Sequence, residues 1–409
     1  MSLRAPKGTD DILPPESRHW RRLLRLWDDL VERYGYELVM TPIFELTEVF
    51  ARGVGEATEV VEKQMYTFAD KGGRSLTLRP ESTAGVVRAY IQGGRSGVFK
   101  GAYSGPMFRY EQPQQGRRRQ FWQLGVEYIG EEAVEADLEV IEVGYRYTTD
   151  AGLADVVVQV NSIGDPPDRA AYLMVLTDFL EAIHGDLSDD AASRIATNPL
   201  RVLDSKADAE VLVDAPVPTD HLSSETRAHF DALLAGLERR EIPYELAPRL
   251  VRGLDYYNRT VFEYVPAGYD AAQSAVGGGG RYDGLSELLG GPHLPSTGLA
   301  LGLDRILVAL GDGVSEPPLD AFVVVTAPAR RAVAWQLVGS LRDSGLRVDA
   351  VASERSVKAQ FRAANRRDAA AVVVVGDEWD SGNVVVKVLA TGQETTVAVQ
   401  HLAAQLEQT

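Results

Sequence analysis

The chain contains no cysteine, which excludes disulfide bonds, cysteine-ligated zinc, iron–sulfur clusters and thiolate nucleophiles. Its six histidines are scattered and include no His-Glu-x-x-His motif, so a histidine-built metal site is not expected. The longest apolar run, Ala369–Val375, is far shorter than the roughly 20 residues that a membrane span needs. Residues Met1–Lys7 lack the apolar stretch of a secretory signal. We therefore expect a cytoplasmic protein without membrane association.

Basic charge is in deficit overall, but the deficit is unevenly distributed. Lysine and arginine number 42 against 59 aspartates and glutamates, a net charge of −17, which by itself argues against nucleic acid as a partner. Residues 165–245 contain 7 basic and 17 acidic residues and so contribute −10. Residues 100–125 have a local balance of +4, and residues 321–409 carry 10 basic and 9 acidic residues. Local patches are therefore a better guide to binding than the total.

A chain of 409 residues is expected to form two or three domains. Apolar spacing predicts a helix over 16–34, and a mainly helical, acidic insertion is predicted over 165–245. A break at 311–318 precedes strands predicted at 322–325, 347–351 and 371–375, which alternate with helices near 332–344 and 354–367. This βαβ pattern indicates a separate α/β domain over 318–409 and leaves 1–317 as the larger domain.

Residues 120–129 alternate in polarity as a strand does. One face carries Trp122, Leu124, Val126 and Tyr128, and the other carries Phe121, Gln123, Gly125 and Glu127. The first set is an ordinary core face. The second places an amide, a carboxylate and an aromatic ring beside a glycine, which suits a ligand site. The alternative is a half-exposed strand whose polar side faces water.

The preceding segment, Pro106–Glu111, is expected to be the partner strand, joined to the first by the Arg-rich loop 112–119. Such a hairpin would bring Arg109 and Glu111 on one arm beside Gln123 and Glu127 on the other. On that sheet face, guanidinium groups could bind a triphosphate and carboxylates could bind a cationic substrate.

Residues 76–85 are predicted to form a strand followed by the start of a helix, with Ser82 or Thr83 as the N-cap. Glu81 lies at this junction, where a carboxylate also has a purely structural role as a favourable charge in the first turn of a helix.

Three more segments combine glycine with charged or aromatic residues. Residues 250–257 form a polar, aromatic stretch that could equally be a charged turn with surface tyrosines. The glycines at 277–280 permit close approach of a ligand or of another backbone. Gly298–Arg305 is predicted to be a strand that runs into a helix, with Arg305 near the helix start, where an acidic residue would suit the helix dipole better. No dinucleotide-binding or P-loop motif is present.

Together these segments make the chain resemble the histidyl-tRNA synthetase family of class II aminoacyl-tRNA synthetases, over essentially its whole length. Thr41-Pro42 lies in the motif 1 region, which forms the dimer interface in this class. Motif 2 matches Phe108–Phe121 and motif 3 matches Gly298–Arg305. Leu78–Glu81 and Arg252–Tyr257 look like the family's histidine-specific signatures, and other class II enzymes do not share the second.

The resemblance implies an α/β protein: an α+β catalytic domain with an antiparallel sheet and a helical insertion, followed by an α/β anticodon-binding domain. It implies a homodimeric ligase that activates L-histidine with ATP to histidyl-adenylate, with Mg²⁺ required, and transfers it to the 3′ end of tRNA(His). Its metal ligands stay unknown. The absence of cysteine fits, because this adenylate chemistry needs no thiol.

Residue roles follow from the matching positions. The histidine contacts would be Glu81, Thr83, Gln123, Glu127, Arg252, Tyr257 and Tyr282. The ATP contacts would be Arg109, Glu111, Arg117, Phe121 and Arg305. Arg109 and Arg252 would be catalytic, since both would contact the α-phosphate where charge develops. An analogue without ring nitrogens would leave buried polar groups unpaired, which explains discrimination without editing.

The predicted tRNA contacts come from two regions. The first is the motif 2 loop, with Gln112 and Gln114. The second is the helix predicted over 354–367, on which Arg355, Lys358, Arg362 and Arg366 form one basic stripe. A basic stripe is often only a solvated face, but in a chain of net charge −17 a phosphate-facing surface is the better explanation.

Three positions depart from the family pattern. Gln112 stands where an Arg is usual, Trp122 where His is common, and Asp304 where Glu is usual. Two alternative functions are the non-aminoacylating regulatory subunit of ATP phosphoribosyltransferase and a sibling synthetase for proline or glycine. The retained arginines Arg109, Arg252 and Arg305 and the full C-terminal domain disfavour the first, and the Arg252–Tyr257 signature disfavours the second.

Overall fold

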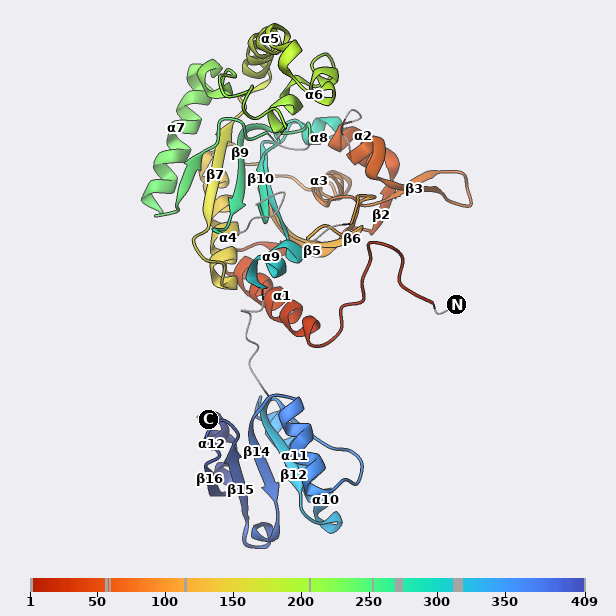
Figure 1. The fold of residues 1–409 in the computed structure, drawn as a ribbon, viewed down its shortest axis with the longest axis vertical. Helices are drawn as coiled ribbons and strands as arrows, with labels where there is room; N and C mark the ends of the chain where they lie inside the picture. The colour runs from red at the N-terminus through yellow and green to blue at the C-terminus, as the bar shows by residue number, and fades with distance from the viewer. Residues whose placement is uncertain are drawn as a thin grey trace. The chain divides into compact units, whose positions relative to one another are not determined.

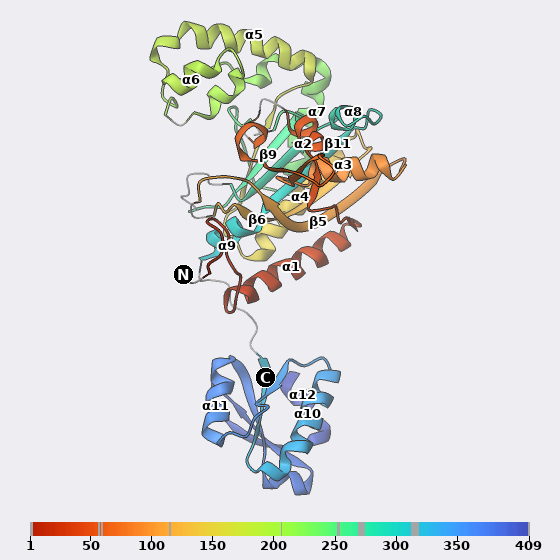
Figure 2. The same ribbon diagram turned by 90° about the vertical axis from the view of Figure 1, so that its right-hand side faces the viewer.

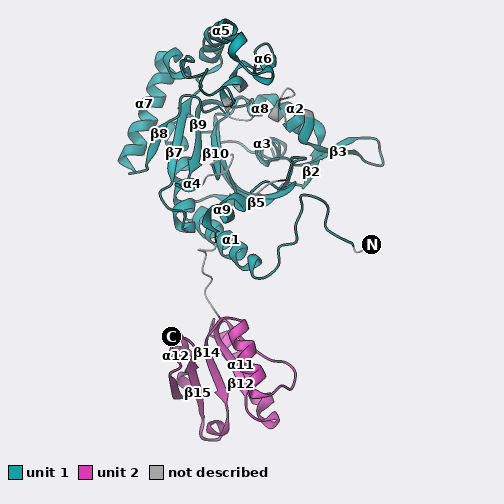
Figure 3. Cartoon of the chain, in the orientation of Figure 1, with its two compact units in different colours: residues 1–314 teal, residues 315–409 magenta. Residues whose placement is uncertain are grey.

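The computed structural model describes residues 3–55, 58, 60–113, 116–205, 207–251, 254–268, 275–311 and 319–407. The chain divides into two compact units, residues 1–314 and 315–409 (Figure 3). Our predicted domain boundary at 317 and 318 lies outside the described residues and stays a prediction. Among the described helices, none is long and apolar enough to cross a membrane.

Unit 1 is built on an eight-stranded sheet (Figure 1). In spatial order its strands are β1 (Glu37–Leu38), β5 (Phe99–Phe108), β6 (Gln120–Ile129), β11 (Ser296–Gly302), β10 (Gly277–Arg281), β9 (Asn258–Val265), β7 (Val157–Ser162) and β8 (Tyr244–Leu246). Only the two edge pairs, β1 with β5 and β7 with β8, are parallel. The predicted antiparallel catalytic sheet is therefore confirmed. A separate three-stranded sheet has the order β2 (Phe44–Leu46), β4 (Ser75–Leu78) and β3 (Tyr66–Ala69).

Helices pack on both faces of the large sheet. The main core joins the sheet to α1 (Glu16–Arg33), α4 (Val134–Ala151), α7 (Ser224–Arg239) and α9 (Leu303–Leu310). Leu124 and Val126 of β6 enter this core, as the alternation predicts. A smaller cluster on the opposite face includes residues of α3 (Thr83–Gln92) and α8 (Leu285–Leu288), and beside it α2 (Thr47–Val54) and a π-helix (Val60–Gln64) contribute a further small cluster. The second face is where polar side chains of the sheet remain accessible.

The predicted hairpin exists, but the bounds predicted for its first arm are wrong. β5 runs from Phe99 to Phe108 and pairs with β6 along its whole length, from Phe99 opposite Ile129 to Phe108 opposite Gln120. Arg109 and Glu111 therefore lie in the loop beyond the strand. The early part of β5 is rich in small residues with weak strand propensity, so its pairing with β6 rather than its own composition decides its length.

The region 165–245 is mainly helical. It contains α5 (Pro166–Ala182), α6 (Asp189–Arg194), α7 and 3₁₀ turns at His184–Asp186, Pro199–Asp204 and Pro218–His221. Asp165 and Asp168 form a capping box at the start of α5. α5 and α6 share a small core of their own and lie at one end of unit 1, whereas α7 packs in the main core (Figures 1 and 2).

Unit 2 has a five-stranded sheet in the order β13 (Val348–Ala350), β12 (Leu319–Val325), β14 (Ala369–Val375), β15 (Asn383–Val388) and β16 (Glu394–Ala398). The first three strands are parallel, as the βαβ pattern predicts, and the last two add an antiparallel hairpin. Figure 2 shows α11 (Val357–Arg366) on one side and α10 (Arg331–Asp343) and α12 (Leu402–Glu407) on the other.

A buried ion pair joins the sheet of unit 1 to its main helices. Arg281 at the end of β10 and Asp137 of α4 are both fully buried and lie 2.6 Å apart. His229 of α7 lies 3.2 Å from Asp137, and the carbonyls of Glu131 and Ala133 accept further bonds from Arg281. Burial alone would raise the pKa of Asp137, but the Arg281 guanidinium holds that pKa below its usual value.

Replacing Arg281 should destabilise unit 1. Arg281→Leu leaves the Asp137 carboxylate buried without its counter-ion, which is expected to lower the free energy of unfolding by about 3–5 kcal/mol. Urea unfolding followed by tryptophan fluorescence measures it. The matched control is Arg194→Leu, which breaks an exposed pair with Asp190 on α6 and should cost less than about 1 kcal/mol. Equal losses in the two variants would contradict the role given to the buried pair.

Candidate active site

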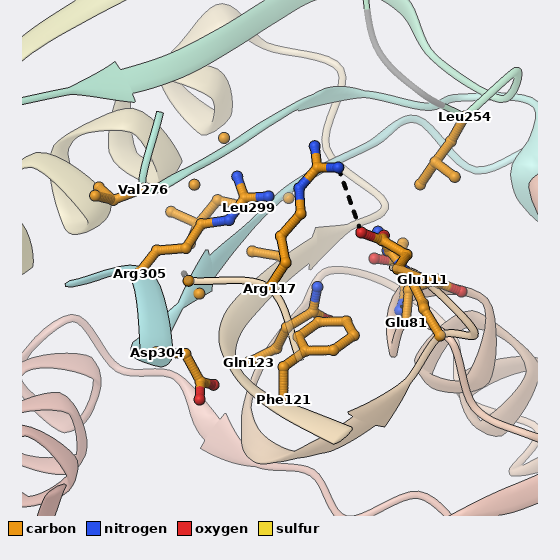
Figure 4. A pocket seen from close by; sticks show the side chains of 18 of the residues that line it. Glu81, Glu111, Arg117, Phe121, Gln123, Leu254, Val276, Leu299, Asp304 and Arg305 are labelled. Atoms are coloured by element: carbon orange, nitrogen blue, oxygen red, sulfur yellow. Dashed lines mark hydrogen bonds and ion pairs between the residues drawn. The ribbon is translucent and has the colours of Figure 1, made fainter. Parts of the chain in front are cut away.

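The accessible face of the large sheet holds a cavity of about 920 Å³, part of it open to solvent (Figure 4). Ten of the predicted site residues line it: Glu81, Thr83, Arg109, Glu111, Arg117, Phe121, Gln123, Tyr257, Tyr282 and Arg305. They come from the start of α3, the β5–β6 hairpin, the segment before β9, the end of β10 and the start of α9. The tertiary structure thus gathers residues separated by more than 200 positions.

The other predicted residues have different positions. Glu127 does not line the cavity and lies directly behind two residues that do. Gln112 is exposed and lies outside the lining. Arg252 and Gln114 fall outside the described residues.

The helix that carries the predicted basic stripe of unit 2 is shorter than expected, so it holds three of the four basic residues. α11 begins at Val357, with Ser356 as its N-cap, so Arg355 precedes the helix. Lys358, Arg362 and Arg366 lie on α11. All four basic side chains are exposed, and none forms an ion pair with the described residues.

Glu81 combines a structural position with access to the cavity. Its carboxylate accepts hydrogen bonds from the backbone N–H groups of Thr83 (2.6 Å) and Ala84 (3.0 Å) in the first turn of α3. Ser82, one of the two predicted N-caps, is the N-cap residue of α3, but its hydroxyl donates to the sulfur of Met107 and makes no capping bond. Burial raises the pKa of Glu81, although the two backbone bonds and Arg109 oppose the shift. The structural and the functional interpretation of Glu81 are therefore compatible.

Gln123 adds a second polar group at the same end. Its side chain is 9 % exposed, and Oε1 has no hydrogen-bond partner among the described residues. A buried amide oxygen without a partner costs free energy that a donor on a ligand would recover. With the Glu81 carboxylate nearby in the lining, this part of the cavity suits an ammonium group.

Glu127 lies flat in the sheet because its neighbours are glycines. It stands opposite Gly101 on β5 and Gly298 on β11, and Gly298 stands opposite Gly280. A Cβ atom on Gly298 would overlap Oε2 of Glu127, and one on Gly280 would lie 2.9 Å from the Tyr257 ring. The glycines of this region therefore make room for neighbouring side chains as well as for a ligand.

The carboxyl group of Glu127 is completely buried but not unpaired. Thr83 Oγ1 donates to one oxygen over 2.7 Å, and the Tyr282 hydroxyl donates to the other. These two bonds favour the ionised form, but burial outweighs them and raises the pKa of Glu127 from 4.5 to about 8. Glu127 thus orients Thr83 and Tyr282, the two residues through which it reaches the cavity.

Three tyrosines form one wall of the cavity. The ring centroids of Tyr256 and Tyr257 are 4.5 Å apart, and those of Tyr257 and Tyr282 are 6.5 Å apart. Burial raises the pKa of Tyr256 and of Tyr282 far above the usual value, so both hydroxyls remain protonated donors. The sequence analysis assigns Tyr256 no role, because nothing in the pattern separates it from Tyr257.

Guanidinium groups also line the cavity. Arg109 donates to the Pro80 carbonyl over 2.9 Å, and its guanidinium lies 5.3 Å from the centre of the Phe121 ring. Arg117 forms an ion pair with Glu111 at 3.5 Å (Figure 4), and Arg305 donates to the Ala275 carbonyl. This combination of cations beside an aromatic platform suits a nucleotide with several phosphates.

Sequence reasoning missed Arg118 as a functional residue. It lines the cavity, and its guanidinium lies within 3.6 Å of three carboxylates, those of Asp10, Glu16 and Asp304. Asp304 also accepts a bond from the Trp122 N–H over 2.8 Å. Arg118 therefore connects the motif 2 loop to the N-terminal segment and to α9. Asp304 of α9 binds this hairpin twice, at the Arg118 guanidinium and at the Trp122 N–H.

No group of three or more acidic or histidine side chains suited to a metal ion occurs within the described ranges. The lining nevertheless offers three carboxylates, Glu81, Glu111 and Asp304. Because Mg²⁺ is commonly held by substrate phosphates with only one or two protein carboxylates, this donor set fits an ion that arrives with a nucleotide rather than one held in a protein cage.

Comparisons with known proteins agree with this geometry. A family model described as "Histidyl-tRNA synthetase" matches residues 8–166 and 172–306, and one described as "Anticodon binding domain" matches residues 320–409. A curated protein named "Histidine--tRNA ligase" from Latilactobacillus sakei is 43% identical, over 99% of this chain and 96% of its own length. One of the same name from Geobacillus kaustophilus is 44% identical, over 98% and 97%.

Solved structures give the same result. The apo histidyl-tRNA synthetase of S. aureus is 38% identical and matches with a TM-score of 0.78, over 99% of this chain and 100% of that one. A Bacillus halodurans chain titled as an ATP phosphoribosyltransferase regulatory subunit/histidyl-tRNA synthetase matches at 24% identity with a TM-score of 0.65, over 88% and 96%. The second likeness shows the fold alone.

The raised pKa of Glu127 predicts a pH-dependent stability. Between about pH 4.5 and pH 8 the folded protein keeps a proton on Glu127 that the unfolded chain releases, so the free energy of unfolding falls as pH rises through this window. In Glu127→Gln this loss should be absent. Denaturant unfolding of the ligand-free protein at pH 5, 6.5 and 8 measures the difference. Glu135→Gln, an exposed position on α4, is the control and should follow the parent protein. Parallel curves for the parent and Glu127→Gln would refute the prediction.

Proposed function

The chain belongs to the histidyl-tRNA synthetase family, and on this premise we propose that its cavity activates L-histidine with ATP and that the histidyl-adenylate is transferred to the 3′ end of tRNA(His). One observation carries the proposal: Glu81 and Gln123, which suit an ammonium group, line the same cavity as Arg109, Arg117 and Arg305 and the Phe121 ring. An amino acid and a nucleoside triphosphate need these two environments side by side.

The histidine would lie among Glu81, Thr83, Gln123 and the tyrosines. Glu81 and Gln123 would accept hydrogen bonds from its α-amino group, and the Thr83 hydroxyl would face the same group. Tyr257 and Glu127 would recognise the ring nitrogens. Because the Tyr282 hydroxyl binds Glu127, Glu127 would act on the ring through Tyr282. An analogue without ring nitrogens would leave these buried groups unpaired, and such a penalty is large enough for specificity without editing.

The ATP would lie over Phe121. Glu111 would contact the adenine amino group, and Arg109 the α-phosphate. Arg117 and Arg305 would bind the outer phosphates and flank the base. Glu111 and Arg117 are paired with each other, so ATP would exchange this ion pair for contacts to its own groups.

In the proposed activation step the protein forms no covalent bond with either substrate. The histidine carboxylate attacks the α-phosphorus and pyrophosphate leaves, so the protein contributes alignment of the two substrates and stabilisation of the developing phosphate charge. Arg109 and Arg252 would supply that stabilisation. Mg²⁺ bound to the phosphates would neutralise charge on them; of the carboxylates in the lining, Asp304 is already bonded to Arg118 and to the Trp122 N–H, and Glu111 is paired with Arg117.

Unit 2 would bind the anticodon end of tRNA. Its family match supports this, and Arg355, Lys358, Arg362 and Arg366 offer exposed cations without ion-pair partners among the described residues. Gln112 and Gln114 in the motif 2 loop would face the acceptor end. The cytoplasmic location stays a prediction from the sequence.

A homodimer is proposed through the region that includes motif 1. Exposed apolar side chains gather on β1, β2, β3 and the residues between the first two strands: Leu38, Met40, Ile43, Phe44, Leu46 and Phe68. The rings of Phe44 and Phe68 lie 6.3 Å apart across β4. A group of exposed apolar side chains of this kind is typical of a protein–protein interface.

The regulatory-subunit alternative has less support. The curated relatives that match over nearly the whole chain carry the ligase name, and the second unit matches an anticodon-binding domain.

Isotope exchange between ATP and pyrophosphate tests the proposed activation step. We expect exchange that requires both L-histidine and Mg²⁺, with no exchange above background for proline or glycine. Arg252→Ala should lower the exchange rate far more than the affinity for histidine, because its contacts strengthen in the transition state. Absence of histidine-dependent exchange would contradict the proposed activation of histidine, and an unchanged exchange rate in Arg252→Ala would contradict the role proposed for Arg252.

Sedimentation equilibrium tests the proposed dimer. Phe44→Glu places a charge in the apolar surface and should shift the protein from twice the chain mass towards the single chain mass. Val213→Glu is the matched control, since Val213 is also exposed and apolar but lies in the helical insertion. A parent protein that sediments as a monomer, or a Phe44→Glu variant that stays dimeric, would contradict the proposed surface.

A further inference from the structure

Two of the cavity tyrosines are each followed in the sequence by a polar residue, and these two polar residues bind each other. Asn258 follows Tyr257, and Asp283 follows Tyr282. The Asn258 Nδ2 donates to Asp283 Oδ2 over 2.8 Å, and the Asp283 backbone N–H donates to Asn258 Oδ1 over 2.9 Å. This reciprocal pair joins the start of β9 to the end of β10 immediately beside the cavity wall.

The pair continues into the helical insertion. Asn258 Nδ2 also lies 3.2 Å from Asp165, the N-cap of α5. The next residue, Arg259, binds the same carboxylate with Nε and Nη2, at 2.9–3.0 Å. The backbone of Arg259 exchanges hydrogen bonds with Ile163 and Gly164, and its φ of +47° is a conformation that non-glycine residues rarely adopt. Burial would raise the pKa of Asp165, but Arg259 holds that pKa below its usual value.

The other end of the pair reaches the buried core. Asp283 Oδ1 accepts from the Ser296 N–H over 2.9 Å and from Arg281 over 3.3 Å. Arg281 is the residue that binds Asp137 of α4. A continuous set of hydrogen bonds and ion pairs therefore runs from the N-terminus of α5, past both tyrosines, to the main core.

The segment that carries Tyr257 borders a second cavity as well as the candidate active site. A second cavity, of about 1750 Å³ and partly open to solvent, is lined by residues 255–259 together with Asp165 and Arg169 of the insertion. Tyr256 and Tyr257 line both this cavity and the candidate active site, so their segment separates the two. The tyrosine rings themselves are buried in the cluster that includes Val86, Ile163 and Tyr282, and the polar contacts of the adjacent residues hold the segment on the side of the second cavity.

We propose that Asn258, Asp283, Arg259 and Asp165 are positioning residues that set the placement of Tyr257 and Tyr282 and couple the active-site cavity to the helical insertion. None of the four lines that cavity, so they act through the tyrosines. For the identity of the substrate the inference rests on the proposed function, whereas the network itself does not. The consequence is selective: a displacement of α5 changes binding at the tyrosine wall and leaves the contacts of Arg109, Arg117 and Arg305 unaffected.

The first test is a comparison of Michaelis constants in ATP–pyrophosphate exchange, carried out on the full chain. Arg259→Gln removes the charge-assisted contact to α5 and should raise KM for histidine roughly tenfold or more, with KM for ATP changed less than about twofold. The matched control is Glu225→Gln, which removes only the exposed partner of Arg259 and should behave like the parent protein. Equal rises in both constants, or no rise for histidine, would overturn the proposal.

A reciprocal exchange of side chains separates positioning from simple loss of stability. N258D alone places two carboxylates face to face, and D283N alone removes the acceptor charge, so both should raise KM for histidine. The double variant N258D/D283N restores an amide–carboxylate pair but leaves a carboxylate beside Asp165, so it should recover part of the parent value. A double variant no better than the worse single variant would contradict the role of the pair.

Hydrogen–deuterium exchange provides a readout that needs no substrate. In Arg259→Gln, amide exchange should accelerate in peptides covering 254–262 and 281–285 and stay unchanged in β12–β14. Unchanged exchange at the tyrosine segments would overturn the coupling whatever the substrate is. If the parent protein lacks histidine-dependent exchange of pyrophosphate, the proposed function fails, and the deuterium experiment still decides the network.

Discussion

The placement of polar groups inside a wide antiparallel sheet is the constraint on which the rest of the site depends. Glu127 is fully buried in the centre of that sheet, between Gly101 and Gly298, and a carboxyl group there is tolerated only with hydrogen-bond partners on both oxygens. Thr83 and Tyr282 are those partners, and both line the cavity. The hydrogen bonds that the buried Glu127 carboxyl group needs therefore fix the positions of Thr83 and Tyr282 in the cavity lining.

The same principle organises the molecule on a larger scale. Arg281 and Asp137 pair in the core, Asp283 and Asn258 pair at the cavity wall, and Asp165 joins that wall to α5. Each polar side chain serves as the partner of the next, so the helical insertion and the site share one network. The charge of −17 is concentrated elsewhere, largely on the exposed side of the insertion region, and leaves the cavity and α11 locally basic.

Much of the site was predictable because its signals are local. The period of two over residues 120–129 separated the core face from the ligand face correctly, since Leu124 and Val126 are in the main core and Phe121 and Gln123 line the cavity. Other features had no local signal. The length of β5 came from pairing with β6, Arg118 was one of three adjacent arginines, and Glu127 gave no indication that it lies behind the cavity rather than in it.

The sequence by itself determined the family, the antiparallel class of the catalytic sheet and the residue types of the site, because motifs and alternation are properties of short segments. The tertiary structure decided which of those residues meet. Glu81 accepts bonds from the first turn of α3 and lines the cavity at once, and Tyr257 is held from behind by contacts of its neighbours with α5. These relations join residues far apart in the chain, and only the packing of strands and helices fixes such distances.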